Sequence, residues 1–183
     1  MAELATFQMH PGDAAPPFSL PGVDGKTWSL TDFTEDPFLV VTFWCNHCPY
    51  VQAWEGRVIA LQKEFTSKGV RFVLINSNDA TSFPDDRFEA MVARAKEKGY
   101  PFPYLRDETQ HVAHAYGAMV TPHPMLFGPD RRLLFQGRID DNHSDSHHVK
   151  HRFLYEALEA ATAGRPVPEA ELPVLGCSVK WRS

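Results

Sequence analysis

Residues 38–49 read Phe38-Leu39-Val40-Val41-Thr42-Phe43-Trp44-Cys45-Asn46-His47-Cys48-Pro49. The first seven residues are an apolar run of strand length, and the residues after the second cysteine follow helical spacing, so both thiols are predicted to lie at a strand-to-helix junction. A helix N-terminus offers unpaired N–H groups and the positive end of the helix dipole, which favour Cys45 as a thiolate nucleophile near neutral pH. Cys48, three positions further on, can then resolve a mixed disulfide within the same chain. The motif therefore predicts dithiol–disulfide exchange.

The cysteine count fits a redox role better than a structural one. The 183 residues include three cysteines, an odd and low number for a secreted disulfide scaffold. The first seven residues lack a positively charged segment followed by an apolar one, and no apolar run approaches the length of a membrane span. A cytoplasmic location and no membrane partner are expected. In such a reducing compartment a Cys-x-x-Cys pair is more often redox-active or metal-binding than structural.

Composition favours one folded unit. With 43% apolar and 22% charged residues the chain can bury one sizeable core, and no repeat indicates a second domain of comparable size. We expect a single domain over residues 1–183, with 1–11 and 166–183 as terminal extensions. The formal net charge of -5, with both signs mixed along the chain, provides no basic stripe, so a nucleic-acid partner is not expected.

The periodicity of apolar residues around the motif predicts alternating strands and helices. The expected strands cover residues 15–20, 24–30, 38–44, 70–76, 101–106, 125–127 and 132–136, and the expected helices cover residues 46–68, 85–99, 109–116 and 145–163. Asp24-Gly25 is the expected hairpin turn between the first two strands. This order predicts an α/β fold with a central mixed sheet, helices on both faces and an N-terminal β-hairpin. A right-handed crossover would place the dithiol at the carboxyl end of a central strand.

Several segments resemble the redoxin branch of the thioredoxin-like superfamily, which includes peroxiredoxin-like (AhpC/TSA-like) and thiol reductase-like proteins. Residues 12–26 resemble the opening extension of that branch, residues 44–49 resemble its active-site motif, and Thr121-Pro122 occupies the place of its cis-proline loop. The segments 137–142 and 176–181 are similar to those of a subgroup of thioredoxin family proteins with a Cys-Asn-His-Cys-Pro motif. The resemblance extends over nearly the whole chain.

This resemblance implies a thiol–disulfide oxidoreductase with the redox-active Cys45–Cys48 disulfide and no other cofactor. Cys45 would be the exposed nucleophile and Cys48 the less exposed resolving thiol, while Trp44 would wall the site and exclude water. A cis Pro122 would leave the backbone N–H and C=O of Thr121 exposed beside the sulfurs, ready to pair with an extended substrate strand. The implied partners are protein or small-molecule disulfides and a thiol reductant.

The residues around the cysteines are expected to tune the redox potential. His47 precedes the second cysteine, as in protein disulfide isomerases and periplasmic oxidases, whose potentials lie roughly 90 to 150 mV above that of thioredoxin. With Asn46 and His47 between the thiols, we predict a redox potential more oxidising than that of thioredoxin.

Pro49 costs the helix little stability because it stands in the first helical turn. The buried aspartate of thioredoxin has no counterpart in the preceding strand, so Glu55 is a candidate for removing the proton of Cys48, with a solvent-facing helix carboxylate as the alternative.

A peroxidase is one alternative function for the same thiols. Thr42-Phe43-Trp44-Cys45 formally matches the Thr-x-x-Cys of peroxiredoxins. However, Thr42 falls inside the predicted strand, and Phe38 replaces the expected proline. Fast peroxide reduction is therefore not expected, and slow dithiol-based reduction stays open.

A metal-binding or delivery module is the other alternative, although we assign no metal site. Structural zinc would require Cys177 and a remote histidine beside the Cys-x-x-Cys pair. His123 and Met125 flank the predicted proline loop, which invites comparison with copper-delivery proteins of this fold. His147, His148 and His151 stand at helical spacing in the predicted last helix, with the first and last on one face, where they could bind a metal or form a solvated helix face. Cys177 remains open as an extra thiol: a second resolving thiol, a regulatory mixed disulfide or a small packed hydrophobe.

Overall fold

The computed structural model describes residues 2–4 and 6–183, and for residues 2–4 it describes the backbone alone. Met1 and Ala5, which belong to the predicted N-terminal extension, lie outside the described residues.

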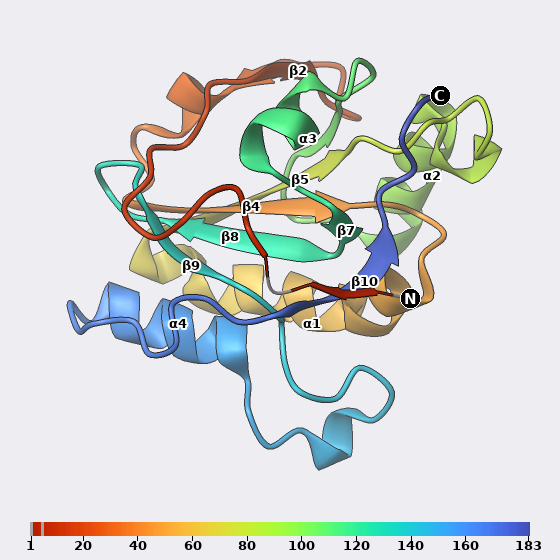
Figure 1. Ribbon diagram of the computed structural model, residues 1–183. Helices are drawn as coiled ribbons and strands as arrows, with labels where there is room; N and C mark the ends of the chain where they lie inside the picture. The colour runs from red at the N-terminus through yellow and green to blue at the C-terminus, as the bar shows by residue number, and fades with distance from the viewer. Residues whose placement is uncertain (1, 5) are drawn as a thin grey trace.

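The centre of the molecule is a five-stranded mixed sheet with the order β6-β5-β4-β8-β9 (Figure 1). Its strands, in that order, are Tyr104–Arg106, Val70–Asn76, Phe38–Trp44, His123–Phe127 and Leu133–Gln136. β4 pairs in parallel with β5 and antiparallel with β8. The predicted α/β fold with a central mixed sheet is confirmed, and the strand that carries the dithiol stands in the middle of the sheet.

Helices cover both faces of this sheet (Figure 1). They are α1 (Pro49–Phe65), α2 (Phe88–Lys98), α3 (His111–Tyr116) and α4 (Phe153–Thr162). α1, α2 and α4 pack into the core on one face, and α3 packs into the core on the other. β4 supplies both cores, since Val40 and Trp44 face α1 while Val41 and Phe43 face the opposite side. Burial on both faces explains why this strand reads as a continuous apolar run.

The predicted N-terminal hairpin is also present. β2 (Ser19–Pro21) pairs antiparallel with β3 (Thr27–Ser29), and Gly25 in the turn adopts a φ of 81°, which favours glycine. A 3-10 helix (Leu30–Phe33) follows and carries the chain into the core on the α3 side. Among the described residues, no helix combines the length and the apolarity that crossing a membrane requires.

The dithiol motif forms the turn between β4 and α1 rather than the first turn of the helix. α1 begins at Pro49 with Cys48 as its N-cap, three residues later than predicted. Its end agrees with the prediction, because a short 3-10 helix (Thr66–Lys68) continues the chain to Gly69, which adopts a φ of 78°. The start of the helix decides which cysteine stands at the helix N-terminus.

The predicted helix over residues 145–163 is wrong in its first half. The α-helix begins only at Phe153, because Asp145 caps a separate 3-10 helix (Ser146–His148) by accepting the N–H of His147 at 2.9 Å. The histidines at 147, 148 and 151 therefore do not share a helix face. The structure does not assemble the metal site that helical spacing allowed.

The C-terminal segment contains a strand that the sequence did not predict. β10 (Val174–Ser178) lies between β1 (Ala2–Leu4) and β7 (Val120–Thr121) in a three-stranded antiparallel sheet. Nearby prolines and a glycine within the segment favoured an irregular tail, and both partner strands are remote in sequence. Because β7 directly precedes Pro122, this strand reaches the proline loop.

Candidate redox site

The structure brings the predicted motif and the predicted proline loop together at the carboxyl end of β4. The Thr121-Pro122 peptide bond is cis, as the resemblance implied. The sulfur of Cys45 lies 3.2 Å from Oγ1 of Thr121, and the sulfur of Cys48 lies 3.4 Å from the Thr121 carbonyl oxygen. Both sulfurs therefore contact one residue of the proline loop.

Both cysteines of the motif are buried, with 1% of Cys45 and 0% of Cys48 exposed. The prediction that Cys45 is exposed is wrong for this structure, in which β10 pairs with β7 beside the sulfurs and sets Cys177 opposite Thr121. The same pairing occupies the Thr121 backbone, which was predicted to receive a substrate strand, and Thr121 is buried. Cys177 itself is half-buried.

Ionisation favours Cys48 over Cys45. Hydrogen bonds from the Cys45 thiol, from Cys177 and from the N–H of Val51 lower the pKa of Cys48 to about 5, against the opposing effect of burial. The hydrogen bond to Cys48, together with burial, raises the pKa of Cys45 well above its usual value. The sequence analysis assigned the thiolate to Cys45, whereas the residue at the N-cap of α1 is Cys48. The Thr121 carbonyl can accept a hydrogen bond from Cys48 only while that thiol is protonated.

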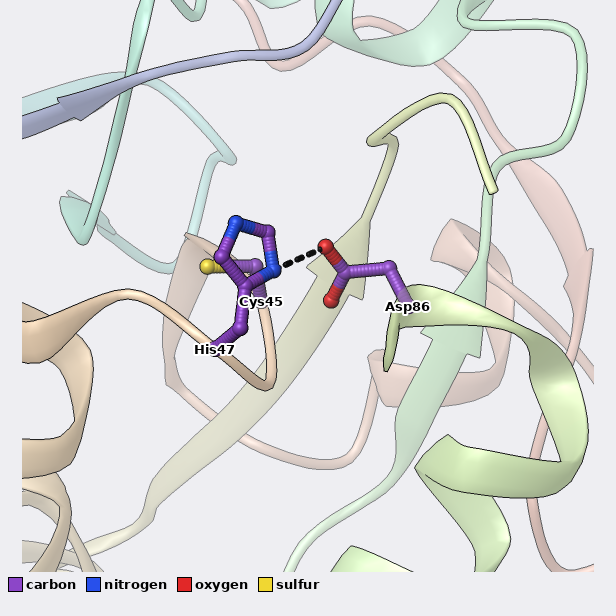
Figure 2. A group of neighbouring side chains, drawn as sticks. All are labelled: Cys45, His47 and Asp86. Carbon is purple, nitrogen blue, oxygen red and sulfur yellow. Dashed lines mark ion pairs between the residues drawn. The ribbon is translucent and has the colours of Figure 1, made fainter. Parts of the chain in front are cut away.

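His47 forms an ion pair with a buried carboxylate that the sequence analysis missed. Its Nδ1 lies 2.6 Å from Oδ2 of Asp86, whose side chain is fully buried, and Figure 2 shows the pair next to Cys45. Asp86 raises the pKa of His47 by more than burial lowers it, and ionised Cys48 adds to the increase. The Asp86 carboxylate therefore favours the protonated imidazole, whose positive charge would lie beside Cys45.

Asp86 is held by donors from the motif and from the end of β5. It accepts hydrogen bonds from the N–H of Asn46 at 2.8 Å and from the side-chain amides of Asn76 at 3.0 Å and Asn78 at 2.9 Å. Burial acts to raise the pKa of Asp86, but the ion pair and these hydrogen bonds outweigh it and lower the pKa. The polar residues after β5 were the available sequence signal, because side chains that follow neighbouring parallel strands meet at one edge of a sheet.

Asn46 and Pro49 fix the shape of the motif. The Asn46 side chain donates to the carbonyl oxygen of Asp85 at 2.8 Å and accepts from the Tyr104 hydroxyl at 2.7 Å. Pro49 stands in the first turn of α1, where its missing N–H costs little. Asn46 therefore ties the turn between the thiols to the loop that carries Asp86.

Trp44 and Glu55 belong to one buried hydrogen-bond chain beneath the site. Trp44 is fully buried, so it can exclude water but does not reach the surface to bind a substrate. Its Nε1 donates to the Tyr100 hydroxyl at 3.1 Å, and Tyr100 donates to Glu55 at 2.5 Å. Glu55 is buried and also binds the Arg94 guanidinium at 2.8 Å. Neither sequence interpretation of Glu55 holds, because its carboxylate faces Arg94 and Tyr100 instead of solvent or the proton of Cys48.

Cys45, His47 and Asp86 could in principle hold a metal ion, since one ligand atom from each lies within 4.8 Å of the others. However, Oδ1 of Asp86 already accepts from Asn46 and Asn76, and Oδ2 accepts from Asn78 and faces His47. An ion would have to displace these donors. The geometry therefore fits an ion pair whose carboxylate already accepts three hydrogen bonds better than an open ligand set.

His123 and Met125 do not join the thiols. His123 stands opposite Phe43 in the register of β4 and β8, and Phe43 and Met125 belong to the core on the face away from α1. The Nε2 atom of His123 lies 3.1 Å from Oε1 of Gln136, and burial lowers the pKa of His123 to about 4, so the ring is neutral. The copper-type arrangement considered for the proline loop is not formed.

Thr42 does not serve the thiols either. It lies inside β4, and its Oγ1 has no hydrogen-bond partner within residues 6–183. A peroxidase of this type needs the threonine hydroxyl of its Thr-x-x-Cys motif to point at the reacting sulfur. Thr42 does not meet this requirement, so the Thr-x-x-Cys match is one of sequence alone.

The stability of the protein should depend on pH through the His47–Asp86 pair. His47 has a raised pKa, so its contribution is complete below its unfolded value of about 6.5 and is lost as the pH rises through the folded value. Asp86 has a lowered pKa, so its contribution is present above its unfolded value of about 3.9 and is lost as the pH falls through the folded value. The pair should stabilise the fold most between about pH 4 and pH 6.5.

Urea unfolding of wild type and His47→Gln from pH 4 to pH 9 measures this contribution. The difference in unfolding free energy between the two proteins is expected to be largest near the middle of that window and to shrink toward pH 9. A difference that stays constant over the whole range would contradict the ion pair.

The fold and the paired thiols define this protein as a thioredoxin-like redoxin. The sequence profile of the AhpC/TSA family matches residues 11–136, and the chain belongs to this family. The chain is similar to the crystal structure of an uncharacterised conserved protein from Geobacillus kaustophilus, with 42% identity and a TM-score of 0.92. That match covers 100% of this chain and 97% of the other.

Two further solved structures share the fold at lower identity. The thioredoxin domain of a thiol-disulfide oxidoreductase from Bacteroides vulgatus is 20% identical with a TM-score of 0.61, and the match covers 70% of this chain and 89% of that one. A peroxidoxin from Mycobacterium tuberculosis is 22% identical with a TM-score of 0.61, over 70% of this chain and 85% of that one. At these identities the likeness shows the fold alone, so it does not choose between disulfide exchange and peroxide reduction.

Proposed function

We propose that this protein is a thiol–disulfide oxidoreductase whose working thiols are Cys45 and Cys48. The observation that carries the proposal is Cys48 at the N-cap of α1 with Cys45 three residues before it, both sulfurs in contact with Thr121 of the proline loop and beside the His47–Asp86 ion pair. A thiolate stabilised in this way is reactive near neutral pH, and a second thiol in contact with it can close a disulfide.

In the proposed reaction the ionised sulfur of Cys48 attacks a substrate disulfide. One substrate sulfur becomes bonded to Cys48, and the other leaves as a thiolate. Cys45 then gives up its proton to the departing thiolate and attacks the Cys48 sulfur, which forms the Cys45–Cys48 disulfide and releases the second substrate sulfur as a thiolate. The roles of the two cysteines are the reverse of those implied by the family resemblance, because burial is nearly equal for both sulfurs and ionisation favours Cys48.

The pairing of β10 with Thr121 bears on the substrate class. A protein substrate docks on a cis-proline loop by adding an extended strand, and that edge is already occupied by this chain's own strand. Small-molecule disulfides therefore fit the proposed site better than folded protein disulfides. Electrons would then be returned by a thiol reductant, as the sequence implied.

The proposed function is tested on protein purified under reducing conditions. Bound metal is measured first, followed by the rate of glutathione disulfide reduction with dithiothreitol as the electron source. After mild oxidation, peptide mass mapping should find a reversible Cys45–Cys48 disulfide in metal-free protein. A stoichiometric metal ion and no such disulfide would favour the metal-binding alternative.

Peroxide reduction is the second candidate, because the chain belongs to the AhpC/TSA family and Cys48 has a lowered pKa. Consumption of hydrogen peroxide by the same protein decides between the two. A rate far above that with disulfides would make the protein a peroxidase. A slow rate would agree with the position of Thr42 inside β4.

The redox potential of the Cys45–Cys48 pair should be more oxidising than that of thioredoxin. Hydrogen bonds to Cys48 and the cation of His47 stabilise the reduced, ionised form, which raises the potential. We expect a value roughly 90 to 150 mV above the thioredoxin value of about -270 mV, measured by equilibration with glutathione buffers. His47→Gln should shift the value toward thioredoxin. A potential at or below that of thioredoxin would contradict the prediction.

A further inference from the structure

β10 fits closely against the proline loop. In the register of β10 and β7, Cys177 stands opposite Thr121 and Ser178 opposite Val120. The residue before, Gly176, approaches so closely that an added Cβ would clash with the Thr121 carbonyl oxygen and lie 2.7 Å from its carbonyl carbon. The strand therefore occupies the edge of the loop that a substrate strand would use.

The segment after β10 is anchored at several points. The N–H of Val179 donates to the carbonyl oxygen of Met119 at 2.8 Å, and the N–H of Lys180 donates to the Asn78 side chain at 2.9 Å. Trp181 stacks on His114 with their ring centroids 4.2 Å apart. These contacts, together with the pairing to β1 on the other edge, indicate a fixed strand rather than a loose flap.

With this strand fixed, Cys177 is the one cysteine of the three that reaches the surface. Cys177 packs against the core cluster that contains Cys45 and Cys48, and it stands opposite Thr121, whose carbonyl oxygen lies 3.4 Å from the Cys48 sulfur. Cys177 is half-buried, whereas Cys45 and Cys48 are buried. The three sulfurs thus form a series from Cys45 through Cys48 to the partly exposed Cys177.

We propose that Cys177 is a third redox-active thiol, which carries disulfide exchange between the buried Cys45–Cys48 pair and an external dithiol reductant. This proposal rests on the proposed oxidoreductase function and adds the route by which the oxidised site is reduced again. It follows from the position of Cys177 opposite Thr121, whose carbonyl oxygen contacts the Cys48 sulfur, from the partial exposure of Cys177, and from the anchoring of β10 against the proline loop.

The first step exchanges bonds inside the protein. The Cys177 sulfur attacks the Cys48 sulfur of the Cys45–Cys48 disulfide, a Cys48–Cys177 bond forms, and Cys45 leaves as a thiolate that takes the proton given up by Cys177. No electron enters or leaves in this step. The disulfide has moved from a buried pair of sulfurs to a pair that includes the half-buried one.

The second step takes two electrons from the external dithiol. One thiolate of the reductant attacks the Cys177 sulfur, and Cys48 leaves as a thiolate, which its lowered pKa favours. The second thiol of the reductant then attacks the reductant sulfur that is bonded to Cys177. This closes the reductant's own disulfide and releases Cys177 as a thiolate. Of the two protons that the reductant gives up, one goes to Cys177 and the other to solvent. The dithiol is oxidised and the three cysteines return to their reduced state.

Cys177 is unreactive in the fully reduced protein. Burial and the adjacent ionised Cys48 raise the pKa of Cys177 to about 11. Once Cys48 is part of a disulfide, its negative charge is gone and one cause of this shift disappears. Cys177 thus becomes more acidic when the site is oxidised, which is when the proposed exchange requires it.

The experiment compares full-length wild type with Cys177→Ser and, as a control on the same strand, Ser178→Ala. Each reduced protein is oxidised with one equivalent of diamide and then mixed with dithiothreitol, and free thiols are followed by alkylation and mass spectrometry. Cys177→Ser should form the Cys45–Cys48 disulfide as wild type does but be reduced about tenfold more slowly or worse. Ser178→Ala should match wild type.

A second variant keeps the proposal testable if Cys177→Ser perturbs the strand. Cys45→Ser retains Cys48 and Cys177 and should form a Cys48–Cys177 disulfide under the same oxidant. Either a wild-type rate of reduction in Cys177→Ser or the absence of that disulfide in Cys45→Ser overturns the proposal. Failure of wild type to form the Cys45–Cys48 disulfide is a different result, which overturns the proposed function itself.

Discussion

Replacing Cys48 by serine should lower the rate of disulfide reduction at least about 100-fold, because the thiolate rather than the thiol is the nucleophile. Cys48 receives hydrogen bonds from Cys45, from Cys177 and from the N–H of Val51, and its pKa is lowered to about 5. In Cys48→Ser the sulfur that remains in the motif is Cys45, whose pKa is no longer raised by Cys48 but is still raised by burial and by the charge of Asp86.

Alkylation by iodoacetamide between pH 4 and pH 9 measures this ionisation directly in the folded protein. Wild type should show a reactive thiol that titrates near pH 5, and Cys48→Ser should lose it. Cys45→Ser provides the matched control, because a serine hydroxyl can still donate a hydrogen bond to Cys48 and preserve the acidic titration. Cys45→Ala removes that donor, so its titration should move toward the usual range of cysteine, about pH 8.5.

The outcome also decides between the two assignments of the cysteines. If peptide mass mapping of wild type found the acidic, iodoacetamide-reactive thiol at Cys45, then Cys45 would be the thiolate, as the sequence motif implied. If wild type showed no thiol that titrated below the usual range of cysteine, no thiol of the motif would be activated and the proposed function would fail with it.

The sequence was sufficient for those features that depend on local pattern. The apolar run before Cys45 predicted a strand buried on both faces, and β4 stands in the middle of the sheet with core residues on each side. The Thr121-Pro122 pair was placed from a family resemblance, and it lies within contact of both sulfurs. In each case the residues that mark the feature are adjacent in the chain.

Features that depend on contacts between distant segments were missed. Asp86 reaches Asn46 across 40 residues, and only the fold shows that the 3-10 helix (Pro84–Asp86) lies over the motif. β10 has no alternating pattern of its own, and it becomes a strand by pairing with residues more than 50 positions away on β7. The missed strand also explains why Cys177 was left unplaced, since only this pairing sets it opposite Thr121.

Gly176→Ala should cause the largest loss of stability among the glycine substitutions near the site. An added Cβ would clash with the carbonyl oxygen of Thr121 and lie 2.7 Å from its carbonyl carbon and 3.2 Å from the nitrogen of Pro122. All of these atoms are backbone, so no side-chain rotation can relieve the contact. β10 must move away from β7, and we expect the free energy of unfolding to fall by about 2 kcal/mol or more.

Urea unfolding followed by circular dichroism measures the loss, and Gly56→Ala is the control. Gly56 lies inside α1 with open space around its Cα, so alanine there should stabilise the protein by up to about 1 kcal/mol. Displacement of β10 should also uncover the thiols, and Cys45 in folded Gly176→Ala should be alkylated about tenfold faster than in wild type. If Gly176→Ala were as stable as wild type and its thiols no more reactive, β10 would not lie against the proline loop, and neither the burial of Cys45 nor the contact between Cys177 and Cys48 could be attributed to it.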